Sequence, residues 1–180
     1  MAGRLFAIVG PSGVGKDTLM AAAQAARPGL HLARRVSTRP ETAGGEPFEG
    51  VSAEEFARRA TSGAFALQWQ AHGLRYGIPA ALREVLAGGR DVLVNLSRAV
   101  LPEAARAFPG LTVIHVTARP EVLARRLTAR GRESAEEIAR RLARPAPPLA
   151  AGLKVIEIDN SGQLEAALAA LLAALDPVKA

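Results

Sequence analysis

The chain has 180 residues, of which 49% are hydrophobic, so it can bury one substantial core and is too short for two ordinary domains. It contains no cysteine, which excludes disulfide bonds, a thiolate nucleophile and cysteine-ligated metal sites. The formal net charge is +6, and nearly all basic residues are arginines, whose planar guanidinium groups suit phosphate. A basic protein can also bind nucleic acid, but no recognition motif supports this, so we expect no nucleic-acid partner.

No stretch of the sequence predicts insertion into a membrane. The apolar run near the N-terminus ends in a glycine-rich loop and lacks a plausible signal-peptide cleavage site. The longest apolar stretch, residues 166–175, is too short to cross a bilayer. We therefore expect a single cytoplasmic domain over residues 1–180, monomeric or homodimeric, without a membrane partner.

The first feature along the chain is a phosphate-binding loop. Residues 5–9 are apolar and partly β-branched, as in a buried parallel strand, and residues 18–23 are good helix formers. Between them, the spacing G-x-x-x-x-G-K predicts backbone N–H groups that cradle the phosphates of ATP and a lysine that reaches the β- and γ-phosphates. The expected ATP-binding residues here are Gly10, Pro11, Ser12, Gly13, Val14, Gly15, Lys16, Asp17 and Thr18. A glycine-rich turn with a chance lysine would not need this spacing between a strand and a helix.

The residue after the loop lysine is usually Ser or Thr, whose hydroxyl holds Mg²⁺, and here it is Asp17. A carboxylate is also a hard oxygen ligand for Mg²⁺. Thr18 offers a hydroxyl one position later. We therefore expect Mg²⁺ as the cofactor, with Asp17 and Thr18 as its candidate ligands.

A small irregular insertion is expected between the core strands, over about residues 34–78. It begins with the segment of residues 36–40, which a glycine-rich loop over residues 42–50 follows. The sequence Ser-Ala-Glu-Glu from Ser52 to Glu55 predicts a capping box that opens a short helix.

The second half of the insertion is expected to contain one strand and one turn. Residues 65–69 favour a strand, and residues 72–77 form a turn-rich segment with one aromatic residue and two potential cations. Pro79 is expected at the start of a further helix that ends at the glycine pair 88–89.

The core resumes with apolar runs separated by helices. The expected strands cover residues 91–96, 112–116 and 155–158. The expected helices cover residues 102–108, 120–130, 135–144 and 162–175. This alternation predicts an α/β fold of three layers, a parallel sheet with helices on both faces. Ligands bind at the carboxyl ends of such strands, so Asn95, Ser97 and Arg98 should lie close to the phosphate loop.

Arginines cluster around a second capping box that begins at Ser134. They are Arg125, Arg126, Arg130, Arg132, Arg140, Arg141 and Arg144. One interpretation is a solvated helix surface, which we accept for Arg125 and Arg140. The other is a lid over about residues 126–145 that brings guanidinium groups to a phosphoryl group in transfer and excludes water.

Together these features resemble the guanylate kinase family of P-loop phosphotransferases, over essentially the whole chain. The resemblance includes the segments 37–39 and 73–77, the spacing of the lid arginines and the pair Asp159–Asn160. It implies a guanylate kinase-like P-loop NTPase fold with a small acceptor-binding insertion and an arginine-rich lid. It also implies that Arg39 and Tyr76 hold the phosphate of the acceptor. The residues implied for catalysis are Lys16, Arg126, Arg130 and Arg141, with Asn160 in the ATP site.

The departures from guanylate kinases concern the acceptor. Residues 40–45 lack the second arginine that binds the acceptor phosphate in that family. Leu67 stands where the resemblance places a guanine-reading glutamate, and Ser97 where it places an aspartate. An apolar side chain cannot accept the hydrogen bonds of a guanine edge, so we do not expect GMP as the substrate.

The same positions are similar to ribose 1,5-bisphosphate phosphokinases, a sister family that makes 5-phosphoribosyl 1-diphosphate from ATP in phosphonate catabolism. This similarity rests on Asp17 after the loop lysine, on residues 94–99 and on residues 67–69. It implies ATP-dependent phosphorylation of ribose 1,5-bisphosphate. The implied acceptor-binding residues are Arg39, Trp69, Tyr76, Asn95, Ser97 and Arg98.

Two of these assignments have competing interpretations. Trp69 fits the sugar pocket and fits a packed core equally well. Kinases of this type usually carry a carboxylate where the strand here ends in Asn95, so we interpret Asp17 as a carboxylate moved into the phosphate loop. The alternative functions are a nucleoside monophosphate kinase with altered base preference and a non-catalytic scaffold that resembles guanylate kinase.

Overall fold

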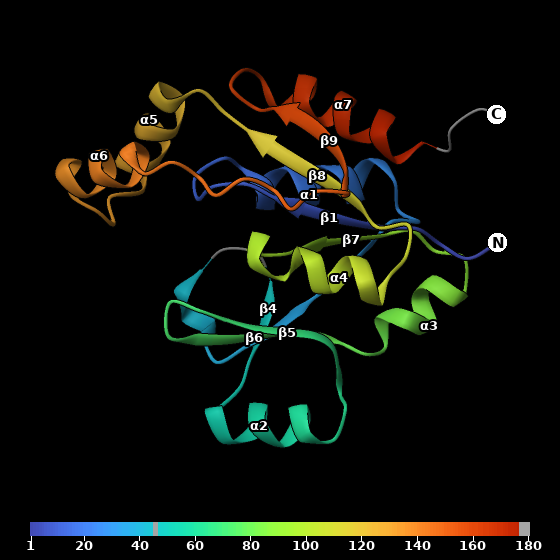
Figure 1. The fold of residues 1–180 in the computed structure, drawn as a ribbon. Coiled ribbons are helices and arrows are strands. Elements are labelled where there is room, and N and C mark those ends of the chain that lie inside the picture. The colour runs from blue at the N-terminus through green and yellow to red at the C-terminus, as the bar shows by residue number, and fades with distance from the viewer. Residues whose placement is uncertain (45–46, 177–180) are drawn as a thin grey trace.

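A computed structural model describes residues 1–44 and 47–176 of the chain, which are organised around two sheets (Figure 1). The core sheet has five parallel strands in the order β2-β7-β1-β8-β9. They are β1 (Leu5–Val9), β2 (His31–Leu32), β7 (Val92–Asn95), β8 (Thr112–Thr117) and β9 (Lys154–Asp159). The four expected core strands are therefore present, with ends that shift by at most one residue, and β2 is a fifth strand that the sequence did not predict.

The helices around the core sheet are α1 (Lys16–Ala26), α3 (Leu82–Ala87), α4 (Leu101–Ala107), α5 (Pro120–Arg130), α6 (Ala135–Ala143) and α7 (Leu164–Leu175). Buried side chains of α1 and α7 pack on one face of the sheet, and those of α3 and α4 on the other. The hairpin of α5 and α6 extends beyond the carboxyl ends of the strands (Figure 1). None of the helices in the described ranges has both the length and the apolar character needed to span a bilayer.

The side chains of β1 show why this sheet is buried on both faces. Leu5, Ala7 and Val9 belong to one buried cluster, and Phe6 and Ile8 to the other. Successive residues of a strand point to opposite faces, so a continuous apolar run fills two cores at once. The predicted three-layer α/β architecture is confirmed.

The predicted insertion is an ordered sheet and not an irregular segment. Its strands, in the order β4-β3-β6-β5, are β3 (Arg35–Ser37), β4 (Phe48–Gly50), β5 (Phe65–Ala71) and β6 (Leu74–Pro79). One helix, α2 (Ala53–Thr61), packs on this sheet, where Phe56 stacks on Phe65 with ring centroids 4.6 Å apart. Short 3-10 helices lie at η1 (Glu41–Ala43) in the insertion and at η2 (Arg98–Val100) after β7.

Two local predictions in the insertion are wrong. The turn is confined to His72 and Gly73, both with positive φ, and β6 begins at Leu74. Pro79 is the last residue of β6, and the helix starts at Leu82 instead. Pro79 pairs with Phe65 of β5. A proline at the end of a strand breaks no backbone hydrogen bond of the sheet, so β6 can extend to Pro79.

The two predicted capping boxes differ in the structure. Ser134 accepts from the backbone N–H of Glu137, and the Glu137 carboxylate accepts from that of Ser134, so this box is complete. At α2, the Ser52 hydroxyl accepts from the backbone of Glu55, but the Glu55 carboxylate binds Arg58 and Arg59. These two guanidinium groups lower the pKa of Glu55 to about 2. Glu55 therefore forms ion pairs on the surface of α2 and does not complete the cap of this helix.

Gly77 allows the insertion sheet to pack against its own aromatic residues. A Cβ at Gly77 would lie 2.6 Å from the Phe65 ring, and that ring is already held by Phe56. We expect Gly77→Ala to lower the free energy of unfolding by about 1–3 kcal/mol, because the ring has to move out of a packed position. Urea unfolding measures this change.

Gly29→Ala is the matched control, since a Cβ at Gly29 meets no atom within 4 Å. Equal unfolding midpoints for Gly77→Ala and Gly29→Ala would contradict the packing constraint at Gly77.

Candidate active site

The phosphate loop connects β1 to α1 and approaches the neighbouring strands very closely. A Cβ at Gly10 would lie 2.5 Å from the carbonyl oxygen of Val116, and a Cβ at Gly15 would lie 2.7 Å from the amide nitrogen of Asn160. Gly15 also has φ 94° as the N-cap of α1. These glycines are therefore required by packing as well as by the curl of the loop.

Lys16 lies across the loop at the first position of α1. Its ammonium group donates to the carbonyl oxygens of Gly10, at 2.6 Å, and Pro11, at 3.3 Å. The positive charge is therefore held over the loop, at the N-terminal end of a helix whose dipole also favours an anion. The predicted phosphate site has the geometry to hold a nucleotide tail.

A cavity of about 460 Å³ opens on one side of this loop and is the candidate donor-nucleotide pocket. Its walls include Gly13, Gly15, Thr18, Arg126, Ala129, Arg130, Asn160, Gly162 and Leu164. The side-chain amide nitrogen of Asn160 donates to the carbonyl oxygen of Val14 at 2.8 Å, while the side-chain oxygen, Oδ1, is buried without a hydrogen-bond partner in the described part of the chain. A buried acceptor without a partner is costly.

The turn after β9 presents Asn160 to the pocket. Asp159 accepts from both the backbone N–H and the hydroxyl of Ser161, and these bonds lower the pKa of Asp159. The Ser161 hydroxyl also accepts from the backbone N–H of Arg119, at the start of α5. The turn is thus tied to α5, the helix that carries Arg126 and Arg130.

The three catalytic arginines predicted for the lid occupy different environments. Arg126 donates to the carbonyl oxygens of Val14, at 3.1 Å, and Asn160, at 2.7 Å, and so bridges the phosphate loop and the turn after β9. Arg130 lines the donor pocket. Arg141 pairs with Glu133 inside the lid, with 2.9 Å between nitrogen and oxygen. The structure brings Arg126 and Arg130 to one pocket and directs Arg141 to a carboxylate.

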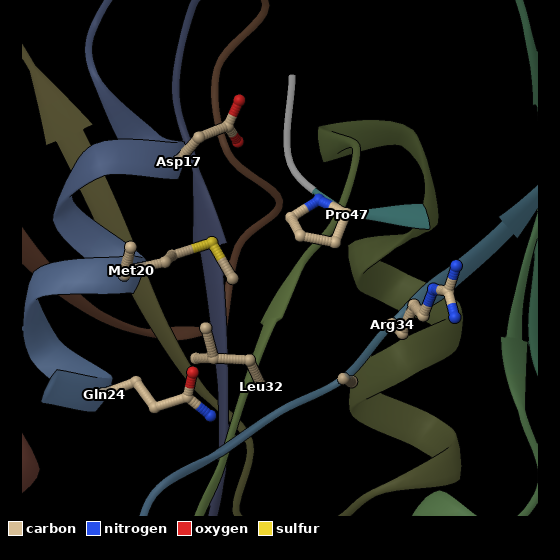
Figure 2. Close-up of a pocket in the computed structure, with 8 residues that line it drawn as sticks. Asp17, Met20, Gln24, Leu32, Arg34 and Pro47 are labelled. Carbon is tan, nitrogen blue, oxygen red and sulfur yellow. The ribbon is translucent and has the colours of Figure 1, made fainter. Parts of the chain in front are cut away.

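A second cavity, of about 310 Å³, lies on the other side of α1, where the core meets the insertion (Figure 2). Asp17 and Met20 come from α1, and Arg34 and Pro47 come from the insertion side. Its walls are formed by Asp17, Met20, Ala21, Gln24, Leu32, Ala33, Arg34 and Pro47. Sequence reasoning missed every wall residue except Asp17, because nothing local to Arg34 or Pro47 shows that they face a helix near the N-terminus.

Asp17 and Thr18 line different cavities, although they are neighbours in sequence. Consecutive residues of an α-helix are turned by about 100° from each other, so one points to each side. We predicted that both residues ligate the metal, but at the start of α1 their side chains line different cavities.

Mg²⁺ fits this site only together with phosphate oxygens. No group of three or more His, Cys, Asp or Glu side chains that could hold a metal ion occurs within residues 1–44 and 47–176. Mg²⁺ in kinases is commonly held by one or two carboxylates together with substrate phosphates. One carboxylate, Asp17, in the first turn after the phosphate loop matches that donor set.

Two of the predicted acceptor residues of the insertion, Trp69 and Tyr76, lie on its sheet, and Arg39 lies in the bend after β3. Tyr76 on β6 pairs with Trp69 on β5, and their rings stack with centroids 5.4 Å apart at 15°. The Arg35 guanidinium lies 5.4 Å from the centre of the Tyr76 ring. Trp69 also packs against the core, which supports the packing interpretation, while its place in a sugar pocket stays a prediction. Arg39 donates to the carbonyl oxygen of Ala43 at 2.8 Å.

The residues after β7 lie at the carboxyl edge of the core sheet, as expected. Asn95 is 7% exposed and pairs with Ile8 of β1, directly before the phosphate loop. Ser97 caps η2, and Arg98 follows it. Arg98 donates to the carbonyl oxygen of Pro147 at 2.5 Å and contacts the Nε2 atom of His115 at 2.9 Å. Sequence reasoning did not identify His115.

Comparison with known proteins places this geometry in a family. No protein-family model matches the chain. A ribose 1,5-bisphosphate phosphokinase PhnN of Ruegeria sp. (strain TM1040) is 54% identical over 167 residues, covering 92% of this chain and 88% of the relative. The PhnN protein of Agrobacterium fabrum is 53% identical over 164 residues, covering 89% of this chain and 90% of that relative. The PhnN protein of Pseudomonas paraeruginosa is 49% identical over 177 residues, covering 96% of this chain and 95% of that relative.

Solved structures agree on the fold. A guanylate kinase from Anaplasma phagocytophilum superposes with a TM-score of 0.70 at 18% identity, covering 97% of this chain and 85% of that one. This confirms the guanylate kinase-like P-loop architecture. At about half identity over nearly the whole length of its relatives, the chain belongs to the ribose 1,5-bisphosphate phosphokinase family.

Proposed function

We propose that the chain transfers the γ-phosphoryl group of ATP to ribose 1,5-bisphosphate and releases 5-phosphoribosyl 1-diphosphate and ADP. The observation that carries this proposal is the pair of cavities on the two sides of α1, the helix that follows the phosphate loop; one is lined by Thr18 and the other by Asp17. A kinase that joins a nucleotide to a second anionic substrate needs two neighbouring sites. The first cavity takes ATP, and the second opens toward the acceptor.

The acceptor side does not suit guanine. Leu67 is only 1% exposed and is part of the packed core, so neither its chemistry nor its position allows it to read a base edge. A site that recognises guanine by hydrogen bonds needs polar groups there. The alternative of a guanylate-type kinase is therefore not favoured, and a scaffold without activity does not require the loop lysine.

The reaction needs alignment and charge neutralisation more than it needs a base. A phosphate monoester is largely dianionic near pH 7, so its oxygen can attack the γ-phosphorus directly. Lys16 and the loop N–H groups hold the β- and γ-phosphates, and Arg130 faces the donor pocket. Arg141 would have to exchange Glu133 for the phosphoryl group, which a closing lid allows.

The acceptor is held by guanidinium groups on two elements. Arg39 from the insertion and Arg98 from η2 bind its two phosphates through the N–H groups that their contacts to the carbonyl oxygens of Ala43 and Pro147 do not use. The stacked pair of Trp69 and Tyr76 shapes the space for the ribose. Asp17 would hold Mg²⁺, which would supply charge neutralisation on the β- and γ-phosphate oxygens. We propose that the enzyme acts in the cytoplasm on these two small molecules, as a monomer or homodimer without nucleic acid.

A substrate panel tests the function. We expect ADP release from ATP with ribose 1,5-bisphosphate and, at matched concentrations, at least a hundredfold lower kcat/KM with GMP or dGMP, as in sites that lack the required hydrogen-bonding groups. A coupled assay for ADP, with the product checked by mass spectrometry, measures this ratio. Comparable values for GMP would overturn the proposal.

The role of Asp17 is tested by Asp17→Asn. We expect half-maximal activity to need at least about tenfold more Mg²⁺, because a charged oxygen ligand is lost, and we expect kcat to fall severely. Activity at a series of Mg²⁺ concentrations measures the shift.

Glu103→Gln is the control for this charge change, since Glu103 is an exposed acidic residue in the first turn of α4. An unchanged Mg²⁺ requirement in Asp17→Asn would rule out Asp17 as the metal-orienting carboxylate.

The bridge made by Arg126 is tested by Arg126→Lys. A lysine cannot span both carbonyl oxygens, so we expect ATP affinity to fall about tenfold, the loss of one charged hydrogen bond. Isothermal titration with ATP gives the dissociation constant. The exposed neighbour Arg125→Lys should bind ATP as the wild type does, and equal losses in the two variants would contradict the bridge.

A further inference from the structure

A chain of polar contacts runs from the last core strand to the proposed acceptor site. Glu157 on β9 pairs across the sheet with His115 on β8, and its carboxylate lies 3.6 Å from the Nδ1 atom of His115. The Nε2 atom of the same imidazole lies 2.9 Å from a terminal nitrogen of Arg98. The other terminal nitrogen of Arg98 donates to the carbonyl oxygen of Pro147 at 2.5 Å, in the segment that returns from the lid.

The chemistry of arginine decides the protonation state of His115. A guanidinium can only donate hydrogen bonds, so the Nε2 atom facing Arg98 has to be the acceptor. The imidazole is then neutral, with its proton on Nδ1, and this proton faces the Glu157 carboxylate. The side chain of His115 is 16% exposed and that of Glu157 is 68% exposed. The imidazole that accepts the hydrogen bond from Arg98 is therefore better protected from solvent than the carboxylate of Glu157.

We propose that His115 is a positioning residue that holds the Arg98 guanidinium in the plane in which it receives a phosphate group of the acceptor. This rests on the proposed function, which assigns Arg98 to the acceptor. A guanidinium has more N–H donors than the contacts to His115 and Pro147 use, so the remaining donors are free to bind an anion. Fixing the plane matters because guanidinium and phosphate pair through two parallel bonds.

The same contact makes the site sensitive to pH. Burial lowers the pKa of His115 below 6.5, and the positive charge of Arg98 lowers it further, while Glu157 raises it. The charged groups that face the imidazole are Arg98 from η2 and Glu157 from β9, and β1 contributes the apolar Val9 beside it. The neutral form dominates above this lowered pKa. As the pH falls through it, Nε2 becomes a donor and repels Arg98.

Two substitutions separate positioning from simple packing. His115→Gln keeps a hydrogen-bond acceptor near the place of Nε2 but cannot titrate, whereas His115→Phe keeps a ring and removes the acceptor. At pH 8 we expect His115→Phe to raise KM for ribose 1,5-bisphosphate about tenfold with kcat changed less than about twofold, and His115→Gln to restore most of the loss. Equal KM values for the wild type and His115→Phe would overturn the proposal.

The pH profile gives a second kinetic test. Lowering the pH from 8 to 5.5 protonates the phosphates of the acceptor, whose second pKa is about 6, equally in all variants. We expect KM of the wild type to rise further than that of His115→Gln over this range. The exposed turn residue His72→Asn is the matched control and should follow the wild type. Parallel profiles for the wild type and His115→Gln, at pH values where the NMR signal of His115 shows that it becomes protonated, would overturn the coupling.

A measurement without activity tests the contact itself. The chain has three histidines, so the imidazole signals can be assigned in NMR spectra with single variants. We expect Arg98→Gln to raise the pKa of His115, because a neighbouring cation is removed. An unchanged pKa would overturn the proposal even if the enzyme is active. An inactive wild type with a raised pKa in Arg98→Gln would instead overturn the proposed function and leave His115 as the group that orients Arg98.

Discussion

The close approach of the phosphate loop to the ends of β8 and β9 is the constraint on which the rest of this structure depends. No side chain fits at Gly10 or Gly15, because the carbonyl oxygen of Val116 and the amide of Asn160 occupy that space. The carbonyl oxygen of Val14 accepts from both Asn160 and Arg126. The loop is therefore held from outside before a nucleotide arrives, which reduces the reorganisation needed to bind an anion.

The first turn of α1 directs neighbouring side chains to different places. Lys16 lies over the loop, Thr18 lines the donor pocket, and Asp17 lines the cavity shared with the insertion. Consecutive helical residues point in different directions, so Asp17 and Thr18 face different cavities. Asp17 stands at the position where such loops usually carry a Ser or Thr hydroxyl that holds Mg²⁺, and in the proposed function its carboxylate takes that role.

The arginines act in separate roles despite their clustering in sequence. Arg126 ties the lid helix to the phosphate loop, Arg130 faces the donor pocket, and Arg141 is paired with Glu133. Arg98 lies outside the cluster and is oriented by His115. A guanidinium that already contacts a carbonyl oxygen or an imidazole is held in place and keeps further donors for phosphate. Most of the charge in this site is therefore ordered by the protein before the substrates bind.

Local sequence determined the parallel strands, the phosphate loop and the helices α5 and α6, because each depends on spacing within a short segment. Only the tertiary structure placed Asn160 against Val14, 146 residues away, and His115 against Arg98. It also moved Tyr76 from an expected turn onto a strand, since pairing with Trp69 outweighs local turn preference. Side-chain periodicity is a property of one segment, whereas a hydrogen bond across the fold depends on how distant segments pack, and no local pattern contains that information.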